Sequence, residues 1–269
     1  MTPSLCLEML FTDRPFIERM RAAARIGYRA IEFWDWRDKD LGDVRSVAQD
    51  LGLQVSTFSG NREFTLIDPR HRGSLLEELR RALDVAAQLE CRHLMLLTDR
   101  LLPDGRAAPA PDLGPASVTL ESVKDALAAA AELAVTSGVT LLLEPLNTRL
   151  DHPGYFLDDS RTAFEVVRQV GSPRVRVLYD VYHMSMMGED VGAAIEAHVS
   201  WLGYVHVADM PGRHEPGTGT IDYAGIRATL HRLGYAAPVG MEFSPSGSSE
   251  IAAQRALEMF APPSPGGRP

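Results

Sequence analysis

The chain has 269 residues, of which 45% are hydrophobic and 23% charged, enough apolar sequence for one large globular domain with a buried core. The formal net charge is −9, and Lys and Arg are scattered along the chain, so the composition argues against nucleic acid as a partner. Only two cysteines occur and no segment reaches roughly eighteen consecutive apolar residues, so we expect a cytoplasmic protein that has no membrane partner.

Short apolar segments rich in Val, Leu, Ile and Tyr alternate with longer patterns of helical periodicity, such as residues 74–89 and 120–136. We expect strands at residues 5–11, 28–34, 53–58, 92–98, 139–147, 175–182, 202–208 and 239–243. Eight strand–helix units predict an α/β protein, a single-domain (β/α)8 TIM barrel over residues 1–260. A doubly wound open sheet is the less favoured alternative, because no G-x-G-x-x-G motif follows the first strand.

Glycines and two irregular segments punctuate this pattern. Four glycines separate a predicted helix from the next strand, and each fits a left-handed helix cap: Gly27, Gly52, Gly138 and Gly171. Residues 103–115 are rich in Pro and Gly and predict a loop over the mouth of the barrel, with a domain linker as the less favoured interpretation. The tail at residues 261–269 is predicted to be disordered.

Four consecutive strands each carry one metal-binding side chain near their C-terminal end. These side chains are Glu144, Asp180, His206 and Glu242, on the fifth to eighth strands. Strand ends of this kind face the active site of a TIM barrel. A single acid at a strand end is usually an ordinary polar residue, but four in register predict a site for one divalent metal ion. Three carboxylates and one imidazole favour Mn²⁺, Mg²⁺ or Co²⁺, with Zn²⁺ as an alternative.

The segment FWDWRDKD, residues 33–40, follows the second predicted strand. Its Trp34 is a candidate for lining a substrate pocket, because an indole ring can stack on the face of a sugar. Arg37 and Lys39 could bind a carboxylate or a phosphate, although solvated loop charges are the favoured interpretation of both.

Four motifs carry a resemblance that extends over nearly the whole chain: LLLEPLNTRLDHPGYFL, VLYDVYHM, HVADMPGRHEPGTG and GMEF. On these motifs the sequence resembles the hydroxypyruvate isomerase family of the xylose-isomerase-like TIM barrel superfamily, alongside ketose 3-epimerases and inosose isomerases. The resemblance implies that Glu144, Asp180, His206 and Glu242 bind the metal and that Glu144 and Glu242 also transfer protons. It further implies that His183 and Arg213 contact substrate oxygens, and it places Asn147 and Asp151 in the same signature as further candidates for binding the substrate.

The resemblance implies a metal-dependent isomerase that interconverts a small hydroxy-ketone and its aldehyde isomer, of the hydroxypyruvate to tartronate semialdehyde type. The reaction would pass through an enediolate, with two glutamates as acid and base. A ketose 3-epimerase, or an isomerase of a longer keto sugar or inosose, is the alternative, because some hydroxypyruvate isomerases carry Gln where this chain has His206. A non-catalytic sugar-binding barrel is a third interpretation. The resemblance also implies a small-molecule substrate and a homo-oligomer.

Overall fold

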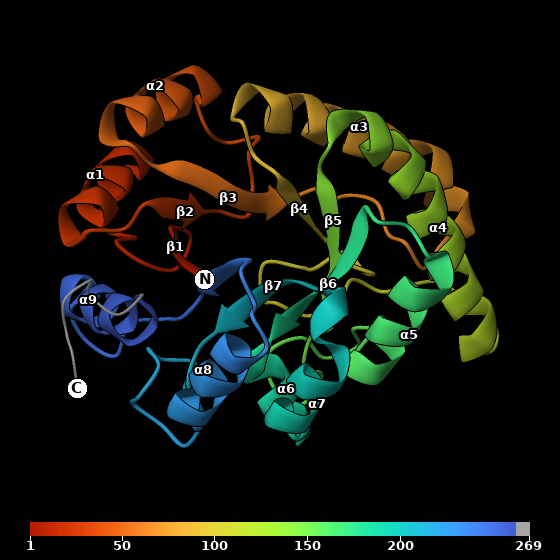
Figure 1. Cartoon of the computed structure of the whole chain (residues 1–269). Coiled ribbons are helices and arrows are strands. Elements are labelled where there is room, and N and C mark those ends of the chain that lie inside the picture. The colour runs from red at the N-terminus through yellow and green to blue at the C-terminus, as the bar shows by residue number, and fades with distance from the viewer. Residues whose placement is uncertain (262–269) are drawn as a thin grey trace.

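The computed structural model describes residues 1–261, which form a closed barrel of eight parallel strands with helices around it (Figure 1). The strands follow one another around the barrel in sequence order, and the last pairs with the first. The strands are β1 (Thr2–Cys6), β2 (Ala30–Glu32), β3 (Gln54–Ser59), β4 (His93–Leu96), β5 (Thr140–Leu143), β6 (Val175–Asp180), β7 (Leu202–Val207) and β8 (Pro238–Met241). The predicted single-domain TIM barrel is therefore confirmed.

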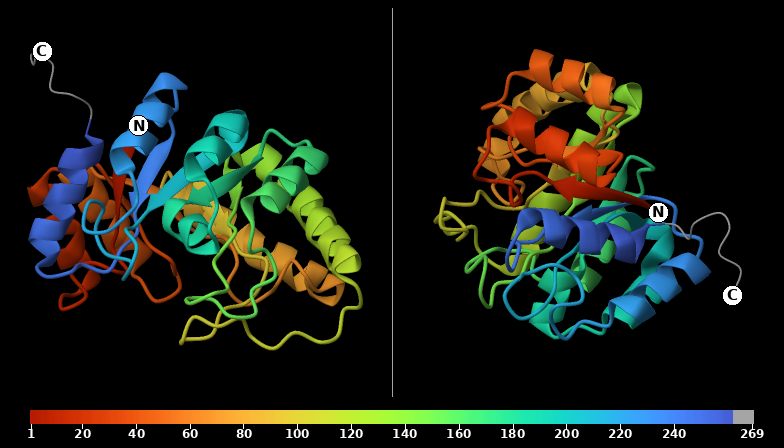
Figure 2. Two further views of the ribbon diagram at one scale, coloured as in Figure 1. Left: turned by 90° about the horizontal axis from the view of Figure 1, so that it is seen from below. Right: turned by 90° about the vertical axis from the view of Figure 1, so that its left-hand side faces the viewer.

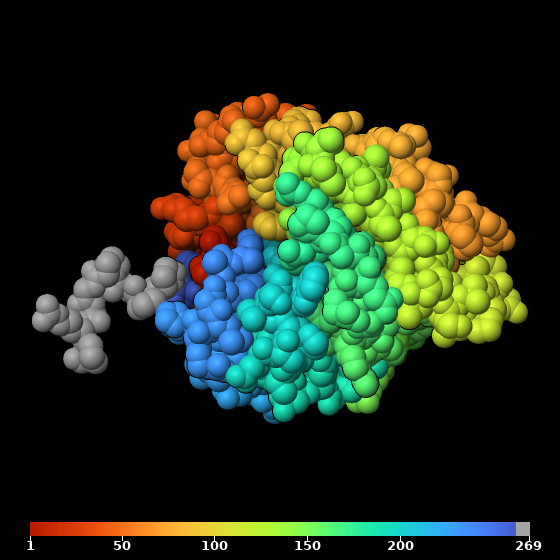
Figure 3. Space-filling model, turned by 45° about the vertical axis from the view of Figure 1, so that its right-hand side comes forward, coloured from red at the N-terminus to blue at the C-terminus, as the bar shows by residue number. Residues whose placement is uncertain are grey.

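Helices cover the outside of the barrel (Figures 1 and 2). They are α1 (Phe16–Ile26), α2 (Leu41–Leu51), α3 (Arg72–Gln88), α4 (Ala116–Ser137), α5 (Ser160–Val170), α6 (Val181–Met187), α7 (Val191–His198), α8 (Tyr223–Arg232) and α9 (Ser249–Phe260), with 3₁₀ turns η1 (Pro69–His71) and η2 (Val199–Trp201). Helices α3, α4 and α5 lie side by side on the outer surface (Figure 3). The four predicted glycine caps are confirmed, since each has a positive φ and ends a helix.

The first strand lies earlier in the sequence than the predicted range 5–11. It ends at Cys6, and Phe11 has a φ of 57°, a left-handed conformation that a strand does not contain. Leu7, Leu10 and Phe11 are nevertheless buried in the core. The apolar sequence therefore extends beyond the end of β1, because the side chains of the loop that follows β1 are also buried in the core.

The loop that contains residues 103–115 lies at the C-terminal end of the barrel strands. Figure 2 shows it, in yellow, beside the green loop that follows β5. The two loops are joined by a hydrogen bond from the Ala107 amide to the Pro153 carbonyl, and Pro103 and Gly105 line a cavity there. The predicted loop over the barrel mouth is thus confirmed, and the domain-linker interpretation is wrong because both flanking segments belong to one barrel.

Three further expectations concern the ends and the composition of the chain. The tail predicted at residues 261–269 lies outside the described residues, apart from Ala261. Among residues 1–261, no helix is long and apolar enough to cross a membrane. Cys6 and Cys91 are both buried free thiols.

Candidate active site

Four side chains from consecutive strands meet at the C-terminal end of the barrel. Each offers one ligand atom, and these atoms lie within 4.8 Å of one another: Glu144, Asp180, His206 and Glu242. Nδ1 of His206 lies 3.3 Å from Oε1 of Glu144, 3.6 Å from Oε2 of Glu242 and 3.9 Å from Oδ2 of Asp180. The barrel thus brings together all four residues that the sequence proposed as ligands, in an arrangement that could hold a metal ion.

The four residues differ in how they face the cavity above them. Asp180 and His206 are fully buried, whereas Glu144 and Glu242 remain 5% exposed and line a cavity of about 370 Å³. Oδ2 of Asp180 has no hydrogen-bond partner within residues 1–261, although it is buried. Because a buried carboxylate oxygen without a partner is costly, this atom fits a metal ligand.

Burial and mutual repulsion shape the electrostatics of the cluster. Burial, together with the negative charge of Glu242, raises the pKa of Glu144 to about 7 and that of Asp180 to about 6. Burial also raises the pKa of Glu242, but the positive charges of His206 and Arg213 outweigh it and leave the pKa below its ordinary value. A divalent cation would stabilise all three carboxylates in their ionised form.

Glu32, at the end of β2, contacts the far side of the His206 ring. Oε1 of Glu32 lies 3.1 Å from Nε2 of His206, but the angle is not that of a good hydrogen bond. The Tyr204 hydroxyl donates a hydrogen bond to Oε2 of Glu32. A Cβ at Gly240 would lie 2.5 Å from Oε1 of Glu32 and from Cδ2 of His206, so only glycine fits beside this pair. Glu32 therefore orients the imidazole whose Nδ1 faces the ligand cluster.

Glu32 was not among the site residues predicted from the sequence. The predicted second strand, residues 28–34, placed this acid in the middle of a strand, but β2 ends at Glu32. The signal was the one that identified the other acids, a short apolar run that ends in a carboxylate. Because the predicted strand extended two residues too far, Glu32 did not appear at a strand end.

His183, a predicted substrate contact, lines the cavity and has a defined ring orientation. The Asn147 amide donates to Nδ1 of His183 and to Oδ2 of Asp151, both over 2.6 Å, while its carbonyl oxygen accepts from the amides of Leu150 and Asp151. Burial lowers the pKa of His183 well below its ordinary value. The neutral ring therefore carries its proton on Nε2, 3.8 Å from Oδ2 of Asp180.

Asn147 and Asp151 occupy different places relative to the cavity. Asp151 lines it and accepts a hydrogen bond from the Tyr182 hydroxyl over 2.9 Å. Asn147 is fully buried and is not among the lining residues. Asn147 therefore holds Asp151 and His183 in place from below, although the sequence proposed it as a substrate contact.

Trp34 and Arg213 both line the cavity and both donate hydrogen bonds to Glu242. Nε1 of Trp34 lies 2.8 Å from Oε1 of Glu242, and Nη2 of Arg213 donates to Oε2. Arg213 has a φ of 55°, which is uncommon for a residue other than glycine and is typical of functional loops. The carboxylate of Glu242 is therefore fixed from two sides.

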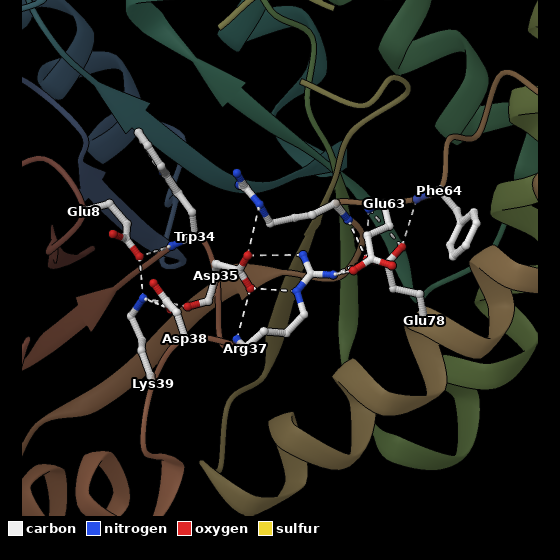
Figure 4. Close-up of polar contacts among 10 residues, drawn as sticks. Glu8, Trp34, Asp35, Arg37, Asp38, Lys39, Glu63, Phe64 and Glu78 are labelled. Carbon is white, nitrogen blue, oxygen red and sulfur yellow. Dashed lines mark hydrogen bonds and ion pairs between the residues drawn. The ribbon is translucent and has the colours of Figure 1, made fainter. Parts of the chain in front are cut away.

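Arg37 and Lys39 are not the solvated charges that the sequence favoured. Nζ of Lys39 lies 2.7 Å from Oε1 of Glu8, and its side chain is only 4% exposed. Arg37 forms ion pairs with three carboxylates, and Figure 4 shows both groups of contacts. Neither cation lines the cavity above Glu144 and Glu242, so neither is placed to bind a ligand there.

The chain is similar to known proteins over most of its length. A family model described as xylose isomerase-like TIM barrel matches residues 20–262. A putative hydroxypyruvate isomerase from Streptomyces coelicolor is 33% identical over 89% of this chain and 89% of its own length. A 2-oxo-tetronate isomerase from Cupriavidus necator is 28% identical over 89% of this chain and 91% of its own length.

A solved structure also matches nearly the whole chain. It is a protein from Brucella melitensis described as an AP endonuclease, family 2, with a TM-score of 0.86 and 27% identity. The match covers 97% of this chain and 98% of that one.

Proposed function

The chain belongs to the xylose isomerase-like TIM barrel family, and from this premise we propose that it is a metal-dependent isomerase of a small 2-keto acid, of the hydroxypyruvate to tartronate semialdehyde type. The names of the similar isomerases support the substrate class. The placement of the two glutamates carries the proposal: both belong to the ligand cluster, and both line the cavity.

The reaction needs one proton to leave the carbon that bears the hydroxyl group and another to reach the neighbouring carbonyl carbon. One of Glu144 and Glu242 accepts the first proton and an acid returns the second, while the hydroxyl proton moves to the former carbonyl oxygen. Neutral His183 offers an N–H to a substrate oxygen, and Arg213 places positive charge beside Glu242. Trp34 and the loop over the mouth, through Pro103 and Gly105, form part of the wall of this cavity.

Asp180 and His206, with Glu144 and Glu242, would hold one divalent ion, with Mn²⁺, Mg²⁺ or Co²⁺ favoured by the oxygen-rich donor set and Zn²⁺ as the alternative. When bound, the ion acts as a Lewis acid that stabilises negative charge on the oxygens of an enediolate. Asp180 and His206 are fully buried, so we assign them to holding the ion and assign proton transfer to the glutamates.

Turnover in D2O tests the proposed reaction. The enzyme with Mn²⁺ is expected to convert hydroxypyruvate and to place deuterium on the carbon that receives the proton, because the transferred proton exchanges with solvent at a carboxylate. NMR detects both results. If neither hydroxypyruvate nor 2-oxo-tetronate reacts, the proposed function is wrong.

The same experiment decides on the alternative, a ketose 3-epimerase or keto-sugar isomerase. His206 in the ligand cluster and the presence of Trp34 in the wall of the cavity favour this alternative. Deuterium in a neutral ketose or an inosose, without reaction of either keto acid, would establish it.

Glu32 provides a prediction about metal affinity. Glu32→Gln is expected to weaken Mn²⁺ binding by about 10- to 100-fold, because a carboxylate beside the far nitrogen of a ligand histidine makes the ring a better donor. Calorimetric titration of the metal measures the change. Glu215→Gln is the matched control, since Glu215 is also a buried carboxylate but bonds to Ser246 and not to His206. Equal effects of the two substitutions would contradict the role of Glu32.

A further inference from the structure

Arg62, in the loop after β3, lines the same cavity as Glu144 and Glu242. Its side chain is 31% exposed, and its Nε lies 3.6 Å from Oδ2 of Asp35. Within residues 1–261, its two Nη atoms form no hydrogen bond with the protein, whereas its backbone amide does. The open side of the guanidinium is therefore available to a ligand in the cavity.

The other basic groups that line this cavity, Arg213, His183 and His152, each contact another part of the protein. Arg213 donates to Glu242 through Nη2, while its buried Nε has no hydrogen-bond partner within residues 1–261. Nδ1 of His183 accepts from the Asn147 amide over 2.6 Å, and Nδ1 of His152 lies 2.8 Å from the Gly105 carbonyl oxygen. Among the described residues, Arg62 is the lining cation whose two Nη atoms are both without a hydrogen bond to the protein, whereas Arg213 uses Nη2 on Glu242.

The backbone of the Arg62 loop is held by one buried carboxylate. Glu78, on α3, is 2% exposed and accepts hydrogen bonds from the backbone amides of Arg62, Glu63 and Phe64, over 2.9, 3.1 and 3.1 Å. Figure 4 shows Glu78 facing this turn of the chain. Since three successive amides bind one carboxylate, the loop has little freedom.

The side chain of Arg62 is oriented by a second carboxylate. Asp35 faces both Arg37 and Arg62, and Arg37 binds it through Nε and Nη2, 2.9 and 3.2 Å from Oδ1 and Oδ2. Burial raises the pKa of Asp35, but the hydrogen bonds from Arg37 outweigh it and leave the pKa below its ordinary value. Asp35 is therefore ionised and holds Arg62 from the side away from its Nη atoms. A guanidinium fixed in this way loses little entropy when it binds a ligand.

We propose that Arg62 binds the carboxylate of the substrate and so selects a 2-keto acid over a neutral ketose. This inference rests on the proposed function and adds the residue that recognises the acid group. Two Nη donors match the two oxygens of a carboxylate. The cavity also contains Glu144, Asp151 and Glu242, and Arg62 places a further positive charge there with which an anionic substrate can pair.

Kinetics of Arg62→Met test the proposal. The KM for hydroxypyruvate is expected to rise by about 10- to 100-fold while kcat changes less, because a charged hydrogen-bonded pair is lost at a distance from the proton transfer. Arg62→Lys should recover part of the affinity, since it keeps the charge and loses the paired donors. Arg70→Met is the control, because Arg70 also pairs with an aspartate, Asp68, but lies outside this cavity.

Binding of tartronate, a dicarboxylate with no reactive carbonyl, gives a readout that does not depend on turnover. Calorimetry with the Mn²⁺-loaded enzyme should show tartronate affinity falling by about 10- to 100-fold in Arg62→Met, with the Mn²⁺ content unchanged. An unchanged KM and an unchanged tartronate affinity in this variant would overturn the proposal, as would failure of the unsubstituted enzyme to bind tartronate. If the enzyme binds tartronate through Arg62 but converts neither keto acid, the proposed function fails and the carboxylate site stands.

Discussion

Replacing Glu242 by Gln is expected to lower kcat for hydroxypyruvate by about 10²- to 10⁴-fold, the contribution of a general acid or base. Glutamine keeps the size of the side chain, and its one carbonyl oxygen can still accept a hydrogen bond from either Trp34 or Arg213. It cannot take up a proton from carbon. Deuterium exchange at the substrate carbon should be lost with turnover.

The control for this substitution is Glu258→Gln, on the exposed face of α9, which removes the same charge far from the cluster. The metal content of the Glu242→Gln enzyme should be measured beside kcat, so that loss of the ion and loss of the base can be separated. Activity near that of the unsubstituted enzyme, with the ion bound, would show that Glu242 is not the acid or base.

Removing the metal with EDTA is expected to abolish turnover of hydroxypyruvate, and adding Mn²⁺, Mg²⁺ or Co²⁺ should restore it. Without the ion, three carboxylates lie with His206 inside a 4.8 Å cluster, and nothing stabilises the negative charge that develops on the substrate. The ion should also stabilise the fold, because it binds the assembled cluster and not the unfolded chain. At about 100 times its Kd this raises Tm by roughly 5–10 °C.

His206→Ala is the matched variant for this experiment. It removes one ligand and should weaken both the recovery of activity and the rise in Tm when metal is added back. Full activity of the metal-free enzyme would show that the cluster is not a metal site. The same conclusion would follow if added metal changed the Tm of neither the unsubstituted enzyme nor the His206→Ala variant.

The sequence alone was sufficient for the barrel and for the four residues of the cluster. The strands that carry Glu144, Asp180, His206 and Glu242 are apolar runs, which local periodicity identifies. A general rule of the fold then places the C-terminal ends of consecutive strands together. No knowledge of particular side-chain contacts was needed, because backbone pairing alone fixes which strand ends are neighbours.

Only the tertiary structure identified the contacts that support and extend the cluster. Glu32 lies beside His206 and Gly240, which are paired neighbours on β7 and β8, and its position there depends on where β2 ends. Lys39 reaches Glu8 across 31 positions, and the Arg62 amide reaches Glu78 across 16. Such pairs join loops to distant elements. Hydrophobic periodicity encodes which face of a strand or helix is buried, but the meeting of two loop side chains is decided by how the closed barrel positions its loops.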